Sequence, residues 1–316
     1  MGSNNPLAIE QFARLADSRL DRVLENYLPP YQAVRKSIFG DMPLDKGFAE
    51  IFTVGTMNNI PKSTGKIQYL DIAPGFYTKI EPAEFLAGIQ MTRKMRDDKQ
   101  YSVFDNLQSD MIEAYGRTQE EDAVKALALA FSATWDYMSS EEGLSICNTS
   151  HTTKSGVSTS SGFSNLSTSA LSPVSIAANR IIFRRFRTDI GKIFNSEPDT
   201  LVVPESLYDA ACQAVGYQPS SGATSALDPA SANHMINVLY KGFKVIPWRY
   251  LDDYSTKSWY MIDSKAAKKQ LLWIDRVKPE TDTRIDWDTK NIQQSIYGRF
   301  GWGAGDWRWV LGAQVS

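Results

Sequence analysis

The spacing of apolar residues predicts that the chain begins with an amphipathic helix. Between residues 7 and 27, apolar side chains recur every three or four positions among charged ones, which is the period of a helix with one buried face. Pro29 and Pro30 end this pattern, because proline breaks a helix interior. Two interpretations stay open: the helix is an arm laid on another molecule, or it packs on its own domain.

From residue 48 the pattern changes to extended runs separated by turn residues, which predicts a β-hairpin with a polar tip. Ile89, Met91 and Met95 then alternate with polar residues, and this period of two predicts a further strand. A two-stranded hairpin is only marginally stable alone in water, so a hairpin that projects from its domain needs a partner surface. The extended runs of the hairpin are expected at 48–56, 66–72 and 76–80.

After Asp98 the apolar period lengthens again and predicts a helix over residues 102–138. At 1.5 Å per residue such a helix is about 50 Å long, more than a compact domain of this size requires. We therefore expect it to act as a structural spine. Its apolar face is formed by Phe104, Leu107, Met111, Tyr115, Val124, Leu127, Phe131 and Trp135.

Residues 149–172 are dominated by serine and threonine, which indicates an irregular or mobile connector with little capacity to bury area. Ser172 and Pro173 then cap a helix expected at about 174–188, because proline suits a first helical turn. A basic face on this helix could bind phosphate, face solvent or contact another subunit. Ile181, Ile182, Phe186 and Ile190 are expected on its apolar face, opposite Arg180, Arg184 and Arg187.

The second half of the chain reads as α+β. Gly301–Gly305 is expected to form a tight bend between strands. Seven of the eight tryptophans lie between residues 248 and 309, so aromatic burial is expected to concentrate there, with Trp302, Trp307 and Trp309 as structural aromatics. A sugar-stacking platform is the second interpretation of this cluster. Strands are expected at 199–204, 243–251, 258–263 and 271–277, a helix at 205–215, and a long extended run at 284–300.

Composition narrows the class of protein. The chain has 316 residues, of which 42% are hydrophobic and 22% charged, as in globular proteins of one large or two modest domains. Lys and Arg (34) nearly balance Asp and Glu (36), so the net charge of -2 provides no overall attraction to nucleic acid. Neither a membrane span nor a signal peptide is recognisable, so we expect a soluble protein made in a cytosol.

Signatures of catalysis are missing from the sequence, and we expect no catalytic, cofactor or metal residues and no enzyme. The chain contains neither a phosphate-binding P-loop nor a nucleophile elbow, and too little sequence follows the glycines of GWGAG for a dinucleotide-binding unit. Cys147 and His151 stand four residues apart, but no second pair completes a zinc site. We expect Cys147 and Cys212 to be buried free thiols. The acidic pairs at 97–98 and 252–253 suit turns and helix starts.

The motif order over residues 48–316 resembles a known family. A projecting hairpin, a long helix, a Ser/Thr-rich passage beginning ICNTSH, and then PDTLVVPESL, WYMID, LLWIDRV and YGRFGWGAGDWRWVLG follow one another. This order resembles the major capsid proteins of tailed bacteriophages with the Hong Kong 97-like fold, and more closely the Mu-type major head subunit group. The resemblance implies an α+β capsid subunit that self-assembles through hexamers and pentamers into an icosahedral shell around double-stranded DNA, without sequence-specific DNA binding.

The resemblance also implies a division of the chain. It places Lys62 and Lys66 near the tip of the E-loop, and we expect them, with Arg180, Arg184 and Arg187, at contacts between subunits. Few residues precede the hairpin, so a separate scaffold protein is expected, together with a portal and possible decoration proteins. Assembly would take place in the host bacterial cytoplasm. The implied parts are an N-terminal arm (1–47), an E-loop (48–82), a P-domain with the spine helix (83–172), an A-domain (173–275), P-domain return strands (276–303) and a closing strand (304–316).

Two alternatives remain beside the phage head. An encapsulin-like compartment would share the fold but enclose protein cargo, so its contents would distinguish it. A carbohydrate-binding or hydrolytic protein would use the Trp-rich C-terminal region instead, and would be recognised by sugar binding.

Overall fold

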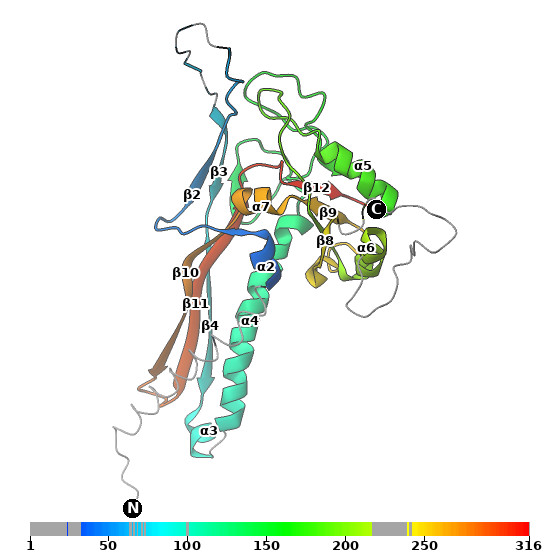
Figure 1. Ribbon diagram of the computed structural model, residues 1–316. Helices are drawn as coiled ribbons and strands as arrows, with labels where there is room; N and C mark the ends of the chain where they lie inside the picture. The colour runs from blue at the N-terminus through cyan, green and yellow to red at the C-terminus, as the bar shows by residue number, and fades with distance from the viewer. Residues whose placement is uncertain are drawn as a thin grey trace, which may run out of the picture.

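Three β-sheets and one long helix make up most of the regular structure in the described part of the chain (Figure 1). The computed structural model describes residues 24, 33–62, 65, 67, 69–70, 72, 74–98, 101–216, 239 and 242–315. Apart from Leu24, the helix expected at 7–27 lies outside these residues. No helix in the described ranges combines the length and the hydrophobicity that a membrane crossing requires.

The long helix α4 (Tyr101–Ala128) lies along one face of an elongated four-stranded sheet. Along the central strand β11, every second residue is buried from Ile292 to Phe300, as expected for a strand with one covered face, and the residues that follow to Ala304 are all buried. Gln108 of α4 donates a buried hydrogen bond of 2.6 Å to Gln294 of β11, and Tyr115 packs edge-on against Phe300. The sheet has the order β1 (Gly40–Asp41), β10 (Leu271–Ile285), β11 (Ile292–Ala304) and β4 (Ala83–Met91).

A second, five-stranded sheet packs beside the carboxyl end of α4. Its central strands are buried on both faces, which explains their nearly continuous apolar sequences. One face packs on α5 (Pro173–Phe183) and α6 (Tyr208–Val215), and the other on the core around α4. The strand order is β6 (Leu166–Ser167), β12 (Val310–Ala313), β9 (Trp259–Ile262), β7 (Thr200–Val203) and β8 (Lys244–Pro247).

The third sheet forms the base of a hairpin that extends away from the body of the molecule (Figure 1). β2 (Ala49–Val54) pairs with β3 (Pro74–Ile80), which in turn pairs with β5 (Met138–Ser140). The remaining elements are short: α2 (Ala33–Ile38), α3 (Arg93–Asp97), α7 (Ser264–Gln270) and the 3₁₀ turns η1 (Glu205–Leu207) and η2 (Arg249–Leu251).

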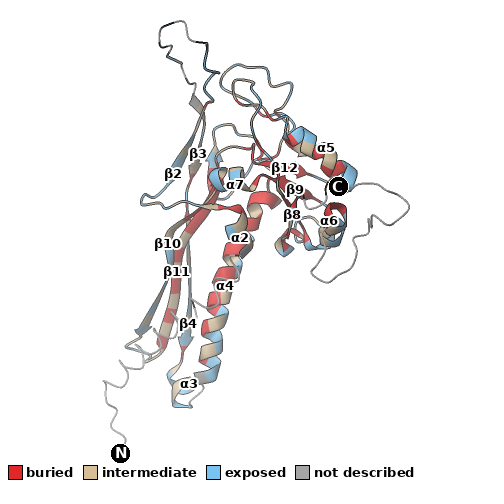
Figure 2. Cartoon of the chain, viewed as in Figure 1, coloured by how far each residue is buried: buried red, intermediate tan, exposed pale blue. Residues whose placement is uncertain are grey.

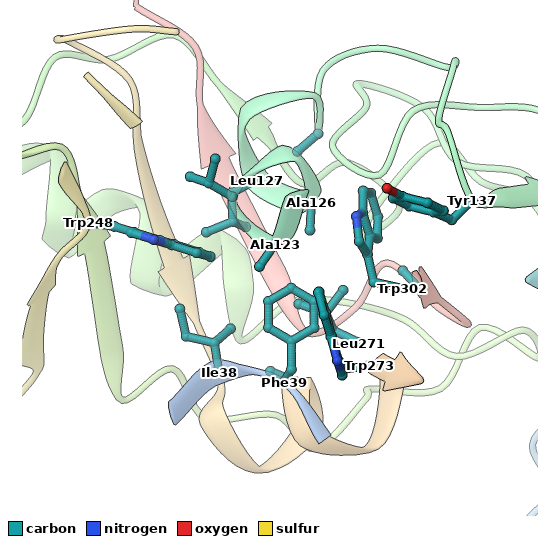
Figure 3. Packing of buried hydrophobic residues seen from close by; sticks show 14 of the residues in the cluster. Ile38, Phe39, Ala123, Ala126, Leu127, Tyr137, Trp248, Leu271, Trp273 and Trp302 are labelled. Carbon is teal, nitrogen blue, oxygen red and sulfur yellow. The ribbon is translucent and has the colours of Figure 1, made fainter. Parts of the chain in front are cut away.

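An aromatic core lies where α4 meets the sheets (Figure 3). Trp273 packs edge-on against Phe39, with ring centroids 5.9 Å apart, and stacks on Phe300 at 5.1 Å. The indole N–H of Trp248 donates to Glu120 of α4 at 3.1 Å, which joins the second sheet to the helix. Figure 2 shows that burial follows the inner faces of α4 and β11 and thins out along the β2–β3 hairpin. The fold is therefore α+β, as the sequence predicts.

The spine helix is confirmed, but it ends ten residues earlier than predicted, at Ala128. Its 28 residues correspond to about 42 Å. The chain turns after Leu127, whose carbonyl accepts the amide of Ala130, and then enters β5. Phe131 prolonged the apparent helical pattern because it returns to the same core, where it stacks on Tyr260 at 5.6 Å.

Two predictions around the hairpin were wrong. Within 66–72, the described positions 67, 69, 70 and 72 form no strand, because the β2–β3 ladder begins only at the Val54–Pro74 pair. Met95 belongs to α3 and not to β4. Thr92 caps the start of α3, because its hydroxyl accepts a hydrogen bond from the backbone amide of Met95. The alternating pattern up to Met91 is confirmed as β4.

The glycine-rich segment 301–305 was predicted as a bend, but its first four residues continue strand β11. Gly303 packs directly against Ile80 at the base of the hairpin, and a Cβ at this position would overlap the Ile80 side chain. Gly298 similarly admits the Tyr115 hydroxyl of α4. These glycines permit close approach between layers and do not turn the chain.

Helix α5 begins as predicted, since Ser172 caps it reciprocally with Ser175, but it ends at Phe183. Its buried face contains Ile176 and Phe183. The predicted apolar face was wrong at Ile181 and Ile182, which are exposed, whereas Phe186 is buried as predicted, just beyond the helix end. The Ser/Thr-rich passage is mostly irregular, as expected. It buries His151, Phe163 and Asn165, however, which corrects the expectation of little burial.

The other predicted elements are largely confirmed. The expected helix at 205–215 is present as η1 followed by α6, and the strand expected at 243–251 stops at Pro247 before η2. The strands expected at 199–204, 258–263 and 271–277 correspond to β7, β9 and the start of β10. The extended run at 284–300 is interrupted by the turn that joins β10 to β11.

Candidate functional site

The projecting β2–β3 hairpin carries the largest collection of exposed apolar side chains in the described structure. Ile60, Ile67 and Tyr69 are 87%, 82% and 92% exposed, and Phe52 is 65% exposed. Large apolar groups gathered in this way on one protruding element are typical of interaction sites rather than of free surface. The hairpin also exposes Phe48, Met57, Ile72 and Tyr77.

The base of the hairpin, in contrast, is firmly attached. Ile80 and Ala49 are buried at the start of the β2–β3 ladder, and β5 pairs with β3 on its other side. Farther out, the Thr53 hydroxyl donates to the carbonyl of Phe76 at 2.6 Å. The hairpin is therefore held at one end and presents its apolar tip to whatever lies beyond the chain. Of the two lysines expected near this tip, Lys62 is exposed, and Lys66 lies outside the described residues.

The three arginines expected on one basic face do not form such a face. Arg184 is exposed and forms an ion pair with Glu197. Arg187 is half-buried, and its guanidinium donates to the carbonyl of Gly191 at 2.9 Å. Arg180 lies half-buried near the end of α5. Only Arg184 is thus fully available at the surface, because the turn after Phe183 redirects the residues that follow.

The three predicted structural tryptophans are buried, as expected. Trp302 is 1%, Trp307 5% and Trp309 0% exposed. A sugar-stacking platform needs open aromatic faces, so these three side chains cannot provide one. The indole of Trp307 instead stacks on the imidazole of His151, with ring centroids 4.2 Å apart and planes 5° from parallel.

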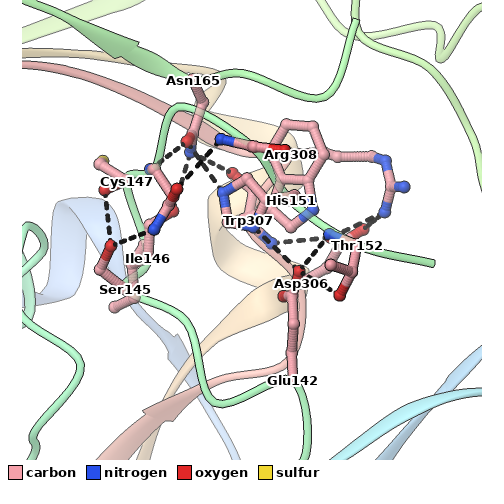
Figure 4. Close-up of polar contacts among 12 residues, drawn as sticks. Glu142, Ser145, Ile146, Cys147, His151, Thr152, Asn165, Asp306, Trp307 and Arg308 are labelled. Atoms are coloured by element: carbon pink, nitrogen blue, oxygen red, sulfur yellow. Dashed lines mark hydrogen bonds and ion pairs between the residues drawn. The ribbon is translucent and has the colours of Figure 1, made fainter. Parts of the chain in front are cut away.

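His151 belongs to a polar network that joins the Ser/Thr-rich passage to the C-terminal strand (Figure 4). The side-chain amide of Asn165 donates to the carbonyls of Ile146 and Val310, at 2.8 and 3.0 Å. The side-chain oxygen of Asn165 therefore points to the Nε2 of His151, 3.0 Å away. Because an amide oxygen only accepts hydrogen bonds, Nε2 carries a hydrogen and donates it to this oxygen. On the other side of the ring, Nδ1 lies 3.1 Å from the Glu142 carboxylate.

Charge in this network is compensated locally. Burial alone would raise the pKa of Glu142, but hydrogen bonding and the charge of His151, with further bonds from Thr152, hold it below its usual value. The buried guanidinium of Arg308 pairs with Asp306 and with Asp189, each at 2.9 Å. It also donates to the carbonyl of Arg187. The network is a fully bonded structural tie, which sequence reasoning missed because its members are far apart along the chain.

The His151 network encloses only a small cavity. The cavity beside the His151 network measures about 50 Å³, far below the roughly 300–1,000 Å³ of ordinary small-molecule sites. No cluster of metal-binding side chains occurs in the ranges that the structure describes. The ring nitrogens of His151 face Glu142 and Asn165, so the Cys147–His151 spacing makes no zinc pair. His234 lies outside the described residues.

The two cysteines are unreactive or unpaired, and one member of each acidic pair has a structural role. Both cysteines are free thiols, and burial raises the pKa of Cys147, which keeps it protonated. Cys212 is only partly buried, in contrast to the expectation. The Asp252 carboxylate accepts hydrogen bonds from the backbone amides of Glu205 and Ser206 and so caps η1. Asp97 forms an ion pair with Arg93.

Comparison with known proteins gives a consistent result. A family model described as phage capsid protein matches residues 77–313. No curated protein matches the chain in sequence. The structure is similar to a subunit of the bacteriophage JBD30 procapsid, with 14% identity, a TM-score of 0.50, and coverage of 98% of this chain and 76% of that one.

Two further solved structures show the same fold. The capsid of cyanophage P-SCSP1u is 10% identical with a TM-score of 0.56, over 89% of this chain and 88% of that one. The SrpI encapsulin complex of Synechococcus elongatus is also 10% identical, with a TM-score of 0.50, over 91% and 88%.

Proposed function

Because this chain belongs to the phage capsid protein family and has the Hong Kong 97-like fold, we propose that it is the major head subunit of a tailed phage. In this proposal, copies of the chain assemble through hexamers and pentamers into an icosahedral shell that encloses double-stranded DNA. The near-neutral net charge of -2 is compatible with a wall that does not hold the DNA at specific sequences. Assignment to the Mu-type group stays a prediction.

The observation that carries this proposal is the exposed apolar tip of the β2–β3 hairpin. A two-stranded hairpin is marginal in water, and exposing Ile60, Ile67 and Tyr69 makes an isolated tip still less favourable. A second copy of the chain that covers the tip removes this cost. Many weak contacts of this type, repeated around a closed shell, provide high overall stability by multivalency.

We assign the parts of the chain on the same basis. Residues 1–47 form the N-terminal arm, 48–82 the E-loop and 83–172 the P-domain with α4 as its spine. Residues 173–275 form the A-domain, 276–303 return to the P-domain, and 304–316 are the closing strand. Lys62 and Lys66 then lie on the E-loop, and Arg180, Arg184 and Arg187 on the A-domain, as contacts between subunits. Of these arginines, exposed Arg184 is best placed.

The partners of the chain follow from its proposed role as a head subunit. A separate scaffold, a portal and decoration proteins would act during assembly in the host bacterial cytoplasm, and the mature location would be the virion capsid. The similarity to an encapsulin supports one alternative with the same fold, a compartment for protein cargo. Particles that contain nucleic acid support the phage head, whereas particles that contain a copurifying enzyme support the compartment.

Deletion of residues 57–66 tests the proposal. We expect a folded subunit that forms no stable shells, because the body of the molecule keeps its core but the hairpin is shortened and loses exposed Met57 and Ile60. Sedimentation and negative-stain microscopy measure assembly, and circular dichroism of the same samples establishes that the subunit is folded. Normal shells from the deletion variant would contradict the role of the hairpin.

A further inference from the structure

The two helices on the five-stranded sheet lie at opposite edges of it. α5 begins directly after β6, which is one edge strand, and α6 packs on β8 and β7 at the other edge. Both helices pack on the same face of the sheet, α5 towards the β6 edge and α6 towards the β8 edge, so they leave separate outer surfaces (Figure 1). The domain therefore has two distinct lateral surfaces, which we call the α5 edge and the α6 edge.

The α5 edge, formed by residues 173–187, combines an apolar stripe with positive charge. Val174 is 79% and Ile181 52% exposed, and Ile182 lies next to them on the outer side of the helix. Arg184 and Arg185 extend this side at the helix end, and both are exposed. Residues 173–187 include four arginines and no acidic residue. A stripe of this kind is unusual on a free helix face, where polar side chains are the rule.

The α6 edge, formed by residues 205–216 and 252–254, has the opposite charge. Glu205 and Asp209 are exposed on η1 and α6, and residues 205–216 contain no Lys or Arg. Asp253 is exposed beside them, next to Tyr254, which offers a half-exposed aromatic ring. Asp252 is engaged within the chain as the cap of η1, so Asp209 and Asp253 are the acidic groups best placed to meet a partner.

We propose that the α5 edge of one copy docks on the α6 edge of the next copy in a closed ring. This proposal rests on the proposed capsid function and specifies which surfaces meet within a ring of five or six subunits. A ring requires a heterologous contact between two different surfaces of the same chain, and the two edges are different and complementary. The apolar stripe covers Tyr254 and the α6 surface, while Arg184 and Arg185 meet Asp209 and Asp253.

Charge complementarity also selects among possible occupants of the α5 edge. A phosphate backbone would satisfy Arg184 and Arg185 but would leave Val174 and Ile181 in water. A second copy satisfies both parts of the edge at once. The internal ion pair of Arg184 with Glu197 is surface-exposed on both sides, so exchanging partners costs little.

Charge reversal tests the docking with variants that preserve the fold. We expect R184E/R185E and D209K/D253K each to reduce ring and shell formation by roughly tenfold or more, because like charges then face each other. We expect the quadruple variant, with both pairs reversed, to recover assembly. R184K/R185K is the matched control, since it keeps the charge and should assemble normally. Native mass spectrometry and negative-stain microscopy measure the assemblies, and thermal melting confirms folding.

The outcomes separate the possibilities. Wild-type protein that forms only monomers at every concentration, both alone and when produced together with a scaffold protein, contradicts the proposed function itself. Wild-type shells together with normal shells from both reversed pairs contradict only the docking of the two edges. Single reversals that fail without recovery in the quadruple variant also overturn it. Normal shells from R184E/R185E that retain less DNA would assign these arginines to nucleic acid instead.

Discussion

Two hairpins of similar design have opposite environments in this molecule. β10–β11 is flanked by β1 and β4 and covered by α4, so apolar residues such as Ile296 are buried. β2–β3 is supported only near its base by β5, and apolar residues such as Ile67 project into solvent. Apolar content alone therefore does not identify a core segment, since isoleucine is buried in one hairpin and exposed in the other.

The largest expected effect comes from placing one charge on each hairpin. Ile296→Asp should prevent folding, because it buries a carboxylate with no partner between β11 and α4. Ile67→Asp should leave the free energy of unfolding within about 0.5 kcal/mol of wild type, as for other exposed sites, yet reduce shell formation. Urea denaturation and sedimentation of both variants measure this contrast. Equal loss of stability in the two variants would break the comparison.

The tryptophans provide a smaller version of the same contrast. Trp307→Ala and Trp309→Ala should each destabilise the subunit by about 3–5 kcal/mol and lower its folding yield, because both side chains are buried. Trp287 is the matched control: it lies on the turn between β10 and β11 and is 82% exposed. Its replacement by alanine should change the melting temperature little. Wild-type melting of the Trp307 and Trp309 variants would contradict their place in the core.

The smallest expected effect concerns the network that ties the Ser/Thr-rich passage to the body. The pKa of Glu142 is lower in the folded protein than its ordinary value of 4.5, so this carboxylate stabilises the fold above about pH 4.5. That contribution is lost as the pH falls through the folded pKa. Glu142→Gln should cost about 1–3 kcal/mol at pH 7 and flatten the acid limb of stability. An unchanged slope between pH 5 and 3 would show that other carboxylates dominate.

Sequence patterns predicted those helices and strands whose position depends on neighbouring residues. The alternation in β4, the spine helix and the capped start of α5 could all be recognised, because periodicity and capping depend on nearby residues. The sequence placed the end of α4 too late, because Phe131 packs on the same core although it follows the turn after the helix. The predicted apolar face of α5 was wrong at Ile181 and Ile182, which follow helical spacing but face outward, although Phe186 is buried as predicted.

The candidate site was only partly predictable. The hairpin and its need for a partner could be inferred from sequence, but the identity of its exposed residues could not, because exposure depends on which elements fail to cover them. Asn165 and Trp307 are 142 residues apart and meet only in the folded chain. No local signal reports such a contact. Gly303 was misinterpreted for a related reason, since its partner Ile80 is even more distant in sequence.

Ile80 packs into the space left by the missing side chain of Gly303, and this contact lies at the base of the hairpin, where the direction of the hairpin is fixed. From Ile80 to Pro74, strand β3 extends about 20 Å at roughly 3.3 Å per residue. A tilt of about 10° at its base would move the far end of this strand by roughly 3–4 Å, the diameter of an atom, and the tip beyond it by more. A small change of angle at Gly303 is therefore enlarged along the length of the hairpin. In the proposed shell, the position at which the hairpin of one subunit meets the next would therefore depend on the contact between Gly303 and Ile80.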